Sequence, residues 1–408
     1  MVKTFKIPWA AWREPDFLDL KFPDSWNVSL CNMKGANDTE LTIDEIRERV
    51  VNPIGSPNLS ELAKGKEKVV IVVDDMTRLT PVSKILPFVF EELEKANITK
   101  DQITILLAIG AHRPMNRTDC ILKLGRDVVD TVNIENHHPY ENLTYFGESK
   151  MGTPIYVNTT YCNSDLKIAI GGVIPHPLAG FGGGAKIVLP GVSGIKTLEF
   201  NHSSGRGGFG RVTRIRKDIE EIAEKVGLDF SINIILSGSG KILGISSGHF
   251  KDAHRKAMEI GKEAYATEIT LNNDICFLNT FPEDSELSQA GKGFNIFFSA
   301  SDKMLDEKGS MVLMSASYEG RGYHSLIAET GAKLYENFGD TAGWRFFLKG
   351  RQLYFFSPNI SKSDLNHFYP KSVKLYDDWN KLIGDLSSVY GNSPISLFQS
   401  SYNFTDFG

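Results

Sequence analysis

Four short runs of apolar residues, many of them β-branched, recur through the first 240 residues of the chain. Stretches of mixed polar and apolar residues with helical spacing separate them, and helices are predicted over 79–98 and 112–125. Strands that are apolar on both faces are typical of parallel sheets covered by helices on both sides. The sequence therefore predicts an α/β fold with a parallel-sheet core. The four runs lie at 68–75, 103–110, 165–172 and 231–240.

The length of the chain predicts more than one domain, because 408 residues is long for a single hydrophobic core. Strand-like runs such as DICFLNTFP and GSMVLMSAS continue beyond residue 270, so the second domain is also expected to be α/β. We expect an N-terminal domain at 1–268 and a C-terminal domain at 269–408, with an active-site cleft between them. A return of the last residues to the first domain is left open.

The overall composition excludes several classes of protein. The formal net charge of −5 lacks the basic surplus of a general nucleic-acid binder. The four cysteines form no CxxC pair, which argues against a structural zinc site and a disulfide framework. No stretch approaches the roughly 20 apolar residues that cross a bilayer, and the N-terminus lacks a secretion signal. We therefore expect a cytoplasmic protein with neither a nucleic-acid nor a membrane partner.

Reactive side chains follow three of the four predicted strands of the first domain. Ligands of open α/β sheets bind beyond the carboxyl ends of the strands. A common rim would therefore collect an acid pair, two arginines and two histidines. The segments concerned are DDMTR at 74–78, GAHR at 110–113 and GGVIPH at 171–176.

The segment DDMTRLTP has two interpretations. Asp75 and Thr77 are common residue types at a helix N-cap, which is a purely structural role. Arg78 would then lie in the first helical turn, where a cation opposes the helix dipole. An arginine in that place suits a carboxylate or phosphate partner instead. Both interpretations remain open from these residues alone.

His112 and His176 are the candidate acid–base residues. A single histidine at a strand end is more often structural than catalytic. Two of them at the ends of separate strands are harder to explain in that way. Because imidazole titrates near neutral pH, such a pair can serve as acid and base in either direction.

The segment 171–191, GGVIPHPLAGFGGGAKIVLPG, contains seven glycines and three prolines but only two side chains suited to acid–base or covalent chemistry, His176 and Lys186. It is not a Walker A loop, because Ala185 precedes the lysine and Ile187 follows it. A glycine-rich turn with a solvated lysine is one interpretation. A partly buried lysine with a more nucleophilic amine is the other.

Three further residues are ambiguous by themselves. His202, in FNHSSG, is unremarkable alone. Gln289 and Lys292, in SQAGKGF, are predicted at the start of a helix that follows a strand. Polar donors in that position suit an anionic ligand, although a solvated face is equally compatible.

Taken together, these stretches resemble the nickel-pincer lactate racemase family. The motifs occur in the family's order over most of the chain, and the glycine–proline segment is the most specific of them. They are DDMTRLTP, GAHR, GGVIPHPLAGFGGGAKIVLPG, the Asn-His pair at 201–202, and QAGK at 289–292. The family has two α/β domains with the active site in the cleft between them.

The resemblance implies a cofactor, a nickel-pincer nucleotide in which a pyridinium-3,5-bisthiocarboxylic acid mononucleotide binds nickel through sulfur, carbon and sulfur. Lys186 matches the lysine that tethers it, and Asp75 matches a carboxylate beside it. His202 matches the histidine that completes the coordination of nickel. The chain shows no cofactor-synthesis function, so maturation proteins are expected partners.

The resemblance also implies an activity, the racemisation or epimerisation of a 2-hydroxy acid by reversible hydride transfer to the pincer. His112 and His176 match the two general bases. The substrate-holding residues of the family are matched by Arg78, Gln289 and Lys292.

One position departs from the family's pattern. Ser288 stands where the lactate enzyme carries an aromatic residue, which predicts room for a substrate larger than lactate, such as a sugar acid. Trp344 is a candidate for a wall of the site, although its surroundings do not establish that role.

Two alternatives remain open. The first is a cofactor-free racemase that uses the two histidines to remove and return a proton, which leaves Lys186 and His202 without roles. The second is a non-catalytic protein that binds the nickel cofactor and tolerates the loss of both histidines.

Overall fold

The computed structural model describes residues 3–203, 207–300, 302–326, 344 and 347–405. The chain divides into two compact units, one made of Met1–Ala36 and Tyr265–Gly408 (unit 1) and the other of Asn37–Ala264 (unit 2). The first 36 residues therefore belong with the C-terminal part of the chain, which differs from the expected domain at 1–268. Strand β3 (Asn27–Cys31) explains the difference, because it pairs in parallel with β18 (Pro394–Phe398) near the other end of the chain.

Unit 2 contains a six-stranded sheet in the order β13-β12-β9-β4-β5-β6. The four runs predicted from sequence form β4, β5, β9 and β12, and these four strands run parallel to one another. Strand β13 joins β12 as an antiparallel edge. The strands are β4 (Val69–Asp74), β5 (Ile103–Ala108), β6 (Asn133–Asn136), β9 (Leu166–Gly172), β12 (Phe230–Leu236) and β13 (Ile242–Gly248).

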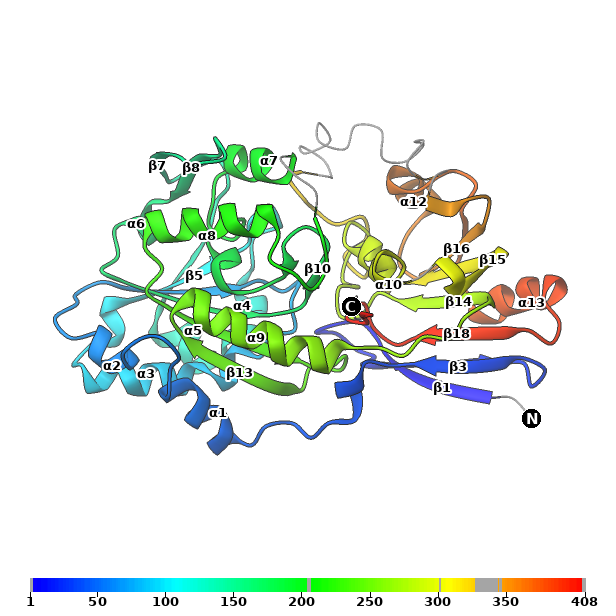
Figure 1. Cartoon of the computed structure of the whole chain (residues 1–408), viewed down its shortest axis with the longest axis horizontal. Helices are drawn as coiled ribbons and strands as arrows, with labels where there is room; N and C mark the ends of the chain where they lie inside the picture. Colours follow the sequence, from blue (N-terminus) through cyan, green and yellow to red (C-terminus); the bar gives the residue numbers. More distant parts are fainter. Residues whose placement is uncertain (1–2, 204–206, 301, 327–343, 345–346, 406–408) are drawn as a thin grey trace. The chain divides into compact units, whose positions relative to one another are not determined.

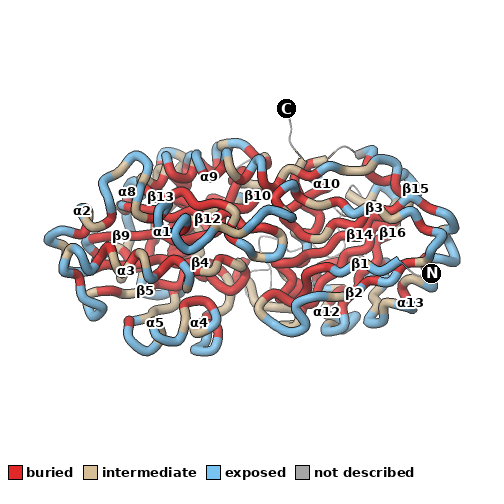
Figure 2. Tube along the Cα trace, turned by 90° about the horizontal axis from the view of Figure 1, so that it is seen from below, coloured by how far each residue is buried: buried red, intermediate tan, exposed pale blue. Residues whose placement is uncertain are grey.

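The central strands of this sheet are buried along almost their whole length, as the red segments of β4, β9 and β12 in Figure 2 show. In β4 every residue from Val69 to Val73 is buried, and burial decreases at Asp74. Polar side chains thus begin where the apolar strand ends. The predicted α/β class with parallel sheets is confirmed.

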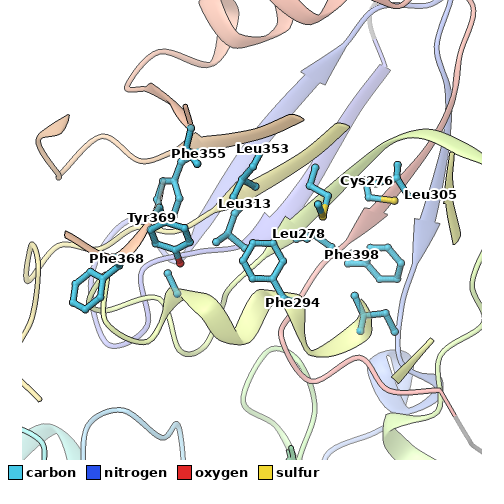
Figure 3. Packing of buried hydrophobic residues seen from close by; sticks show 14 of the residues in the cluster. Cys276, Leu278, Phe294, Leu305, Leu313, Leu353, Phe355, Phe368, Tyr369 and Phe398 are labelled. Atoms are coloured by element: carbon cyan, nitrogen blue, oxygen red, sulfur yellow. The ribbon is translucent and has the colours of Figure 1, made fainter. Parts of the chain in front are cut away.

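Unit 1 contains a second six-stranded sheet, entirely parallel, in the order β17-β16-β15-β14-β18-β3. Successive residues of β14 (Asn273–Asn279) point to opposite faces. Cys276 and Leu278 pack in one hydrophobic cluster, drawn in Figure 3, while Ile275 and Phe277 pack in another. The other strands are β15 (Leu305–Met314), β16 (Gln352–Phe356) and β17 (Lys374–Tyr376).

The helices and the small sheets complete the two units (Figure 1). The helices of unit 2 are α1 (Ile43–Val51), α2 (Leu59–Leu62), α3 (Leu86–Lys95), α4 (Arg117–Leu124), α5 (Arg126–Thr131), α6 (Thr159–Cys162), α7 (Ile195–Ser203), α8 (Arg214–Val226) and α9 (Phe250–Tyr265). Among the described residues of unit 1, the helices are α10 (Asn295–Ser299), α12 (Lys362–Phe368) and α13 (Trp379–Val389). Within the described residues, two-stranded sheets pair β1 (Lys3–Pro8) with β2 (Phe17–Phe22), β7 (Leu143–Glu148) with β8 (Pro154–Asn158), and β10 (Pro175–His176) with β11 (Gly180–Phe181).

Two helices begin later than the sequence predicts. The helical pattern over 79–98 becomes α3 only at Leu86, and the pattern over 112–125 becomes α4 only at Arg117. The reactive residues at the strand ends therefore lie in turns. Among the described helices none is long and apolar enough to cross a membrane.

Candidate active site

Three loops of unit 2 follow the neighbouring strands β9, β4 and β5, and hydrogen bonds tie them to one another. The backbone N–H of Gly172, at the end of β9, donates to Asp74 Oδ2 over 2.9 Å. The N–H of Gly110, after β5, donates to the carbonyl of Gly191 over 2.9 Å. The segment 171–191 is thus fixed at one end to the β4 loop and at the other to the β5 loop.

Asp75 and His112 form a close pair. His112 Nδ1 lies 2.5 Å from Asp75 Oδ2, and Thr77 Oγ1 donates to Asp75 Oδ1 over 2.6 Å. Burial tends to raise the pKa of Asp75, but His112 and Arg78 together lower it below its usual range. A carboxylate can only accept, so Nδ1 of His112 is the donor and a neutral ring carries its lone pair on Nε2. That arrangement suits His112 to act as a general base.

Arg78 lies in a turn rather than in a helix. Its N–H donates to the carbonyl of Asp75 over 3.2 Å, and its guanidinium donates to Thr77 Oγ1 over 2.9 Å. The first helical segment after it begins only at Val82. The argument that Arg78 opposes a helix dipole is therefore wrong, and the N-cap interpretation of Asp75 and Thr77 fails for the same reason. Half-buried, Arg78 supplies positive charge beside Asp75.

The glycine-rich loop, residues 171–191, adopts backbone conformations that residues with a side chain rarely adopt. Gly180, Gly183 and Gly184 all have positive φ, at 78°, 68° and 55°. A Cβ on Gly180 would lie 1.9 Å from the carbonyl oxygen of Arg211, and one on Gly184 would lie 2.9 Å from the ring of His254. The loop thus packs closely against the surrounding structure, and glycine is required at these positions.

His176 and Lys186 face each other across this loop. Lys186 Nζ lies 2.8 Å from His176 Nε2, while His176 Nδ1 accepts from the backbone N–H groups of Leu178 and Ala179 over 3.2 and 3.1 Å. Because Nδ1 accepts, a neutral ring carries its proton on Nε2. An Nε2–H can donate to Lys186 only when the amine is neutral, which is the nucleophilic form of lysine.

His202 lies on helix α7, and its ring is set for metal binding at one nitrogen. Nδ1 lies 2.9 Å from the carbonyl of Leu198, one turn earlier, so it donates and leaves the lone pair on Nε2. Burial and the charge of Lys186 lower the pKa of His202 to about 4. The imidazole is thus neutral at physiological pH, as a metal ligand must be. The influence of Lys186 on this pKa also places the two side chains in one electrostatic neighbourhood.

Gln289 and Lys292 lie in unit 1, at the 3-10 helix Ala290–Phe294. Gln289 is buried, and Lys292 Nζ forms an ion pair of 2.7 Å with the buried carboxylate of Glu283. Ser288 donates its hydroxyl to Glu286. The sequence prediction missed Glu283, which orients Lys292.

Comparisons with known proteins identify the family. The family model described as the lactate racemase N-terminal domain matches residues 15–207. A lactate racemase of Lactiplantibacillus plantarum is 31% identical over 299 residues, which cover 69% of each chain. A lactate racemase of Thermoanaerobacterium thermosaccharolyticum is 30% identical over 290 residues, 68% of this chain and 67% of that protein.

The chain belongs to the lactate racemase family. The resemblance inferred from the sequence motifs is thereby confirmed, and membership identifies the protein as an isomerase of the racemase class.

The fold agrees with solved structures. The structure of the lactate racemase apoprotein from T. thermosaccharolyticum matches 98% of this chain and 99% of its own, with a TM-score of 0.77 at 22% identity. A crystal structure of a Thermotoga maritima protein matches 90% of this chain with a TM-score of 0.66 at 19% identity.

The residues of unit 2 fit the cofactor that the lactate racemase family implies. Among the described residues, no three His, Cys, Asp or Glu side chains gather into a metal site. His202 offers one neutral nitrogen, and Lys186 offers an amine in the same neighbourhood. One imidazole beside one lysine suits a metal held mainly by a tethered organic ligand.

Trp344 is partly buried and packs against a hydrophobic cluster of unit 1. Its ring packs 5.9 Å from that of Phe294 and 5.2 Å from that of Tyr369, and its Nε1–H donates to the carbonyl of Phe368. Phe294 and Tyr369 lie in the cluster of Figure 3. The contacts of Trp344 are therefore those of a packing residue.

Sequence reasoning also missed Lys123, which organises the β4 loop. Its ammonium is fully buried, 2.7 Å from Asp74 Oδ1, and it donates to the carbonyls of Asp75 and Arg78 over 2.9 and 2.8 Å. The available signal was its place in the apolar pattern CILKLG, one residue before the buried Leu124.

Proposed function

We propose that this protein racemises or epimerises a 2-hydroxy acid with a nickel-pincer nucleotide as cofactor. The observation that carries the proposal is the grouping of Lys186, His176 and His202. Lys186 Nζ lies 2.8 Å from His176 Nε2, and its charge lowers the pKa of His202. These residues would supply a tether, an acid–base histidine and a metal ligand within unit 2.

The assigned roles follow from the chemistry of each group. Lys186 would attach the cofactor through its amine, and His202 Nε2 would bind nickel. When bound, this cofactor supplies a hydride acceptor that can return the hydride to either face of a keto acid. His112 Nε2 takes the hydroxyl proton of the substrate, because Asp75 holds the proton of the ring on Nδ1. His176, whose Nδ1 accepts from two backbone N–H groups, would return a proton from Nε2 to the substrate in the opposite orientation.

The substrate is proposed to be larger than lactate, for example a sugar acid. Arg78 would hold its carboxylate through paired N–H donors. The resemblance assigns substrate binding to Gln289 and Lys292 as well. At Ser288, where the lactate enzyme has an aromatic ring, a short hydroxyl directed to Glu286 leaves space and polar partners for a hydroxylated chain.

The test begins with protein produced together with the pincer-synthesis enzymes, which are the proposed maturation partners. Intact mass and nickel content are measured, followed by chiral chromatography of a panel of 2-hydroxy acids. We expect stoichiometric nickel, an added mass on the Lys186 peptide, and interconversion of at least one substrate pair. Lys186→Ala should remove the added mass, whereas His202→Ala should reduce nickel and retain the mass.

The alternatives predict different results. Nickel without added mass identifies a non-covalent relative. Folded protein with neither nickel nor added mass overturns the cofactor assignment and favours the cofactor-free racemase. A protein that carries the cofactor but converts no substrate, with or without the His112→Asn and His176→Asn changes, is a cofactor carrier.

A further inference from the structure

Helix α8 carries two buried charged residues, Arg216 and Asp218, that the proposed chemistry does not use. Each is almost completely excluded from solvent, with exposed fractions of 1% and 2%. Burying a charge is costly unless several hydrogen bonds compensate for it, so each residue should be surrounded by partners. The partners are the backbone of the glycine-rich loop for Arg216 and the end of helix α7 for Asp218.

Arg216 gathers the carbonyl groups of the glycine-rich loop around one guanidinium. It donates to Ala179 over 3.4 Å, to Gly182 over 3.3 Å and to Gly183 over 3.1 Å, and also to Phe181. Burial lowers the pKa of Arg216 to about 10, so the group stays charged at neutral pH. A planar cation with five donors suits such a curved run of carbonyls, and no other side chain supplies that geometry.

Two neighbours on α8 and α9 hold the same loop. Thr213, the N-cap of α8, donates its hydroxyl to the carbonyl of Leu178 over 2.8 Å. His254 on α9 lies with Nε2 2.7 Å from the carbonyl of Gly182, and burial lowers the pKa of His254 well below its usual value. Side chains at the start of α8, on α8 and on α9 thus all contact backbone carbonyls of this loop.

Backbone groups of the same loop residues also orient the reactive side chains. Ala179 accepts from Arg216 at its carbonyl and donates to His176 Nδ1 at its N–H. The carbonyl of Gly183 accepts both from Arg216 and from the N–H of Lys186, which lies 3.2 Å away. A shift of the Arg216 side chain would therefore move His176 and Lys186 together.

Asp218 fixes the end of helix α7, which carries His202. Its carboxylate accepts from Asn201 Nδ2 and from Thr153 Oγ1, each over 2.8 Å, and also from the hydroxyl of Ser149. Asn201 directly precedes His202 on α7. The Asn-His pair of the sequence is thereby explained, since the asparagine fixes the helix end that presents the histidine.

We propose that Arg216 and Asp218 are positioning residues, and that helix α8 sets the placement of Lys186 and His202 relative to each other. The two residues are two positions, about half a turn, apart on α8. The same helix therefore holds both the glycine-rich loop and the end of α7. This inference rests on the proposed function for the chemical roles of Lys186 and His202. The placement itself is testable in protein without cofactor.

The experiment is hydrogen exchange by mass spectrometry on the cofactor-free full chain, comparing wild type with Arg216→Met and Asp218→Asn. We expect Arg216→Met to accelerate exchange about tenfold or more in peptides from 171–191 and to leave those from 195–203 nearly unchanged. Asp218→Asn should give the reverse pattern. Arg216→Lys keeps the charge but cannot span four carbonyls, so it should resemble Arg216→Met.

Matched controls lie on the exposed side of the same helix. Arg214→Met and Glu224→Gln remove a charge from α8 without touching the loop or α7, and they should leave both sets of peptides unchanged. Equal acceleration throughout unit 2, or no acceleration in the loop peptides, would overturn the proposal. If wild-type protein never acquires nickel, the proposed function fails while the exchange pattern still decides the positioning role.

Discussion

At the scale of single residues, Asp75 determines which nitrogen of His112 is available. The carboxylate accepts from Nδ1 at 2.5 Å, so the lone pair of the neutral imidazole lies on Nε2. His112 and then Arg78 lower the pKa of Asp75 below its usual range, and Thr77 adds a hydrogen bond to the second carboxylate oxygen. The tautomer of the neutral His112 ring is thus set by Asp75.

Asp75→Asn is expected to reduce turnover by roughly a hundredfold or more with little change in folding. The amide nitrogen of asparagine would donate to Nδ1, and the ring would then carry its proton on Nε2, where the base is needed. Turnover of the nickel-loaded protein and the melting temperature are the two measurements. Thr77→Val serves as the control, since it removes one bond to Asp75 and keeps the carboxylate. Equal turnover in wild type and Asp75→Asn would contradict the assignment of His112 as a base oriented by Asp75.

At the scale of elements, the glycine-rich loop depends on close packing as well as on left-handed backbone. Gly184 has φ of 55°, and its N–H donates to Asn233 Oδ1 over 2.8 Å. A Cβ at this position would meet the ring of His254 at 2.9 Å. Gly65 has a similar φ of 71° but has no atom within 4 Å of its Cβ position. Alanine at Gly65 would therefore cost only the free energy of the left-handed backbone, whereas alanine at Gly184 would add a steric collision with His254.

Gly65→Ala should therefore lower the stability of the protein by about 1 kcal/mol and preserve activity. Gly184→Ala should cost about 2 kcal/mol or more, because overpacking adds to the same backbone term. It should also reduce attachment of the cofactor at Lys186, two residues away. Thermal unfolding and intact mass after cofactor loading measure the two effects. Similar losses in both variants would show that packing against His254 contributes nothing.

The strands were predictable from sequence, whereas the turns that hold the reactive residues were not. Buried parallel strands such as Val69–Asp74 leave a continuous apolar run that needs no tertiary information. The delayed start of α3 depends on distant groups instead. Asp74 accepts from Thr80 at 2.5 Å and from the N–H of Gly172, and Lys123 holds the carbonyl of Arg78. These bonds hold Arg78 and Thr80 outside α3, although the predicted helical pattern begins at Leu79.

The same limit applies to the residues that support the site. Asp75 and His112 follow adjacent strands, so the sequence could predict that they lie near each other. Arg216 was not, because its partners are backbone carbonyls that carry no signature in the sequence. Its one signal is its position on the buried stripe of α8, where it precedes Ile219 by one turn and Ala223 by two. A charged residue on the apolar face of a helix indicates that it has a buried partner, but the sequence does not show which group that partner is.

At the scale of the whole molecule, the two units contain buried ionisable groups with opposite responses to acid. In unit 2, burial lowers the pKa of His137 to about 4, and burial together with Lys186 does the same for His202. In unit 1, burial raises the pKa of Asp284 to about 6, although the N–H groups of Ala10 and Ala11 donate to its carboxylate. The sign of each contribution follows from which state binds more protons.

Between about pH 6.5 and about pH 4 the unfolded histidines bind a proton that the folded ones do not, so stability falls as pH falls, by about 1.4 kcal/mol per pH unit for each histidine. Asp284 acts in the opposite direction, because its contribution is present at low pH and is lost as pH rises through about 6. His137→Gln keeps a donor for the carbonyl of Ser193, which His137 Nε2 contacts at 3.0 Å, and removes the titration. It should therefore reduce the fall in melting temperature between about pH 7.5 and about pH 5. Asp284→Asn removes the opposing contribution and should enlarge that fall. The same pH dependence in wild type and His137→Gln would mean that His137 is protonated in the folded protein, contrary to its burial.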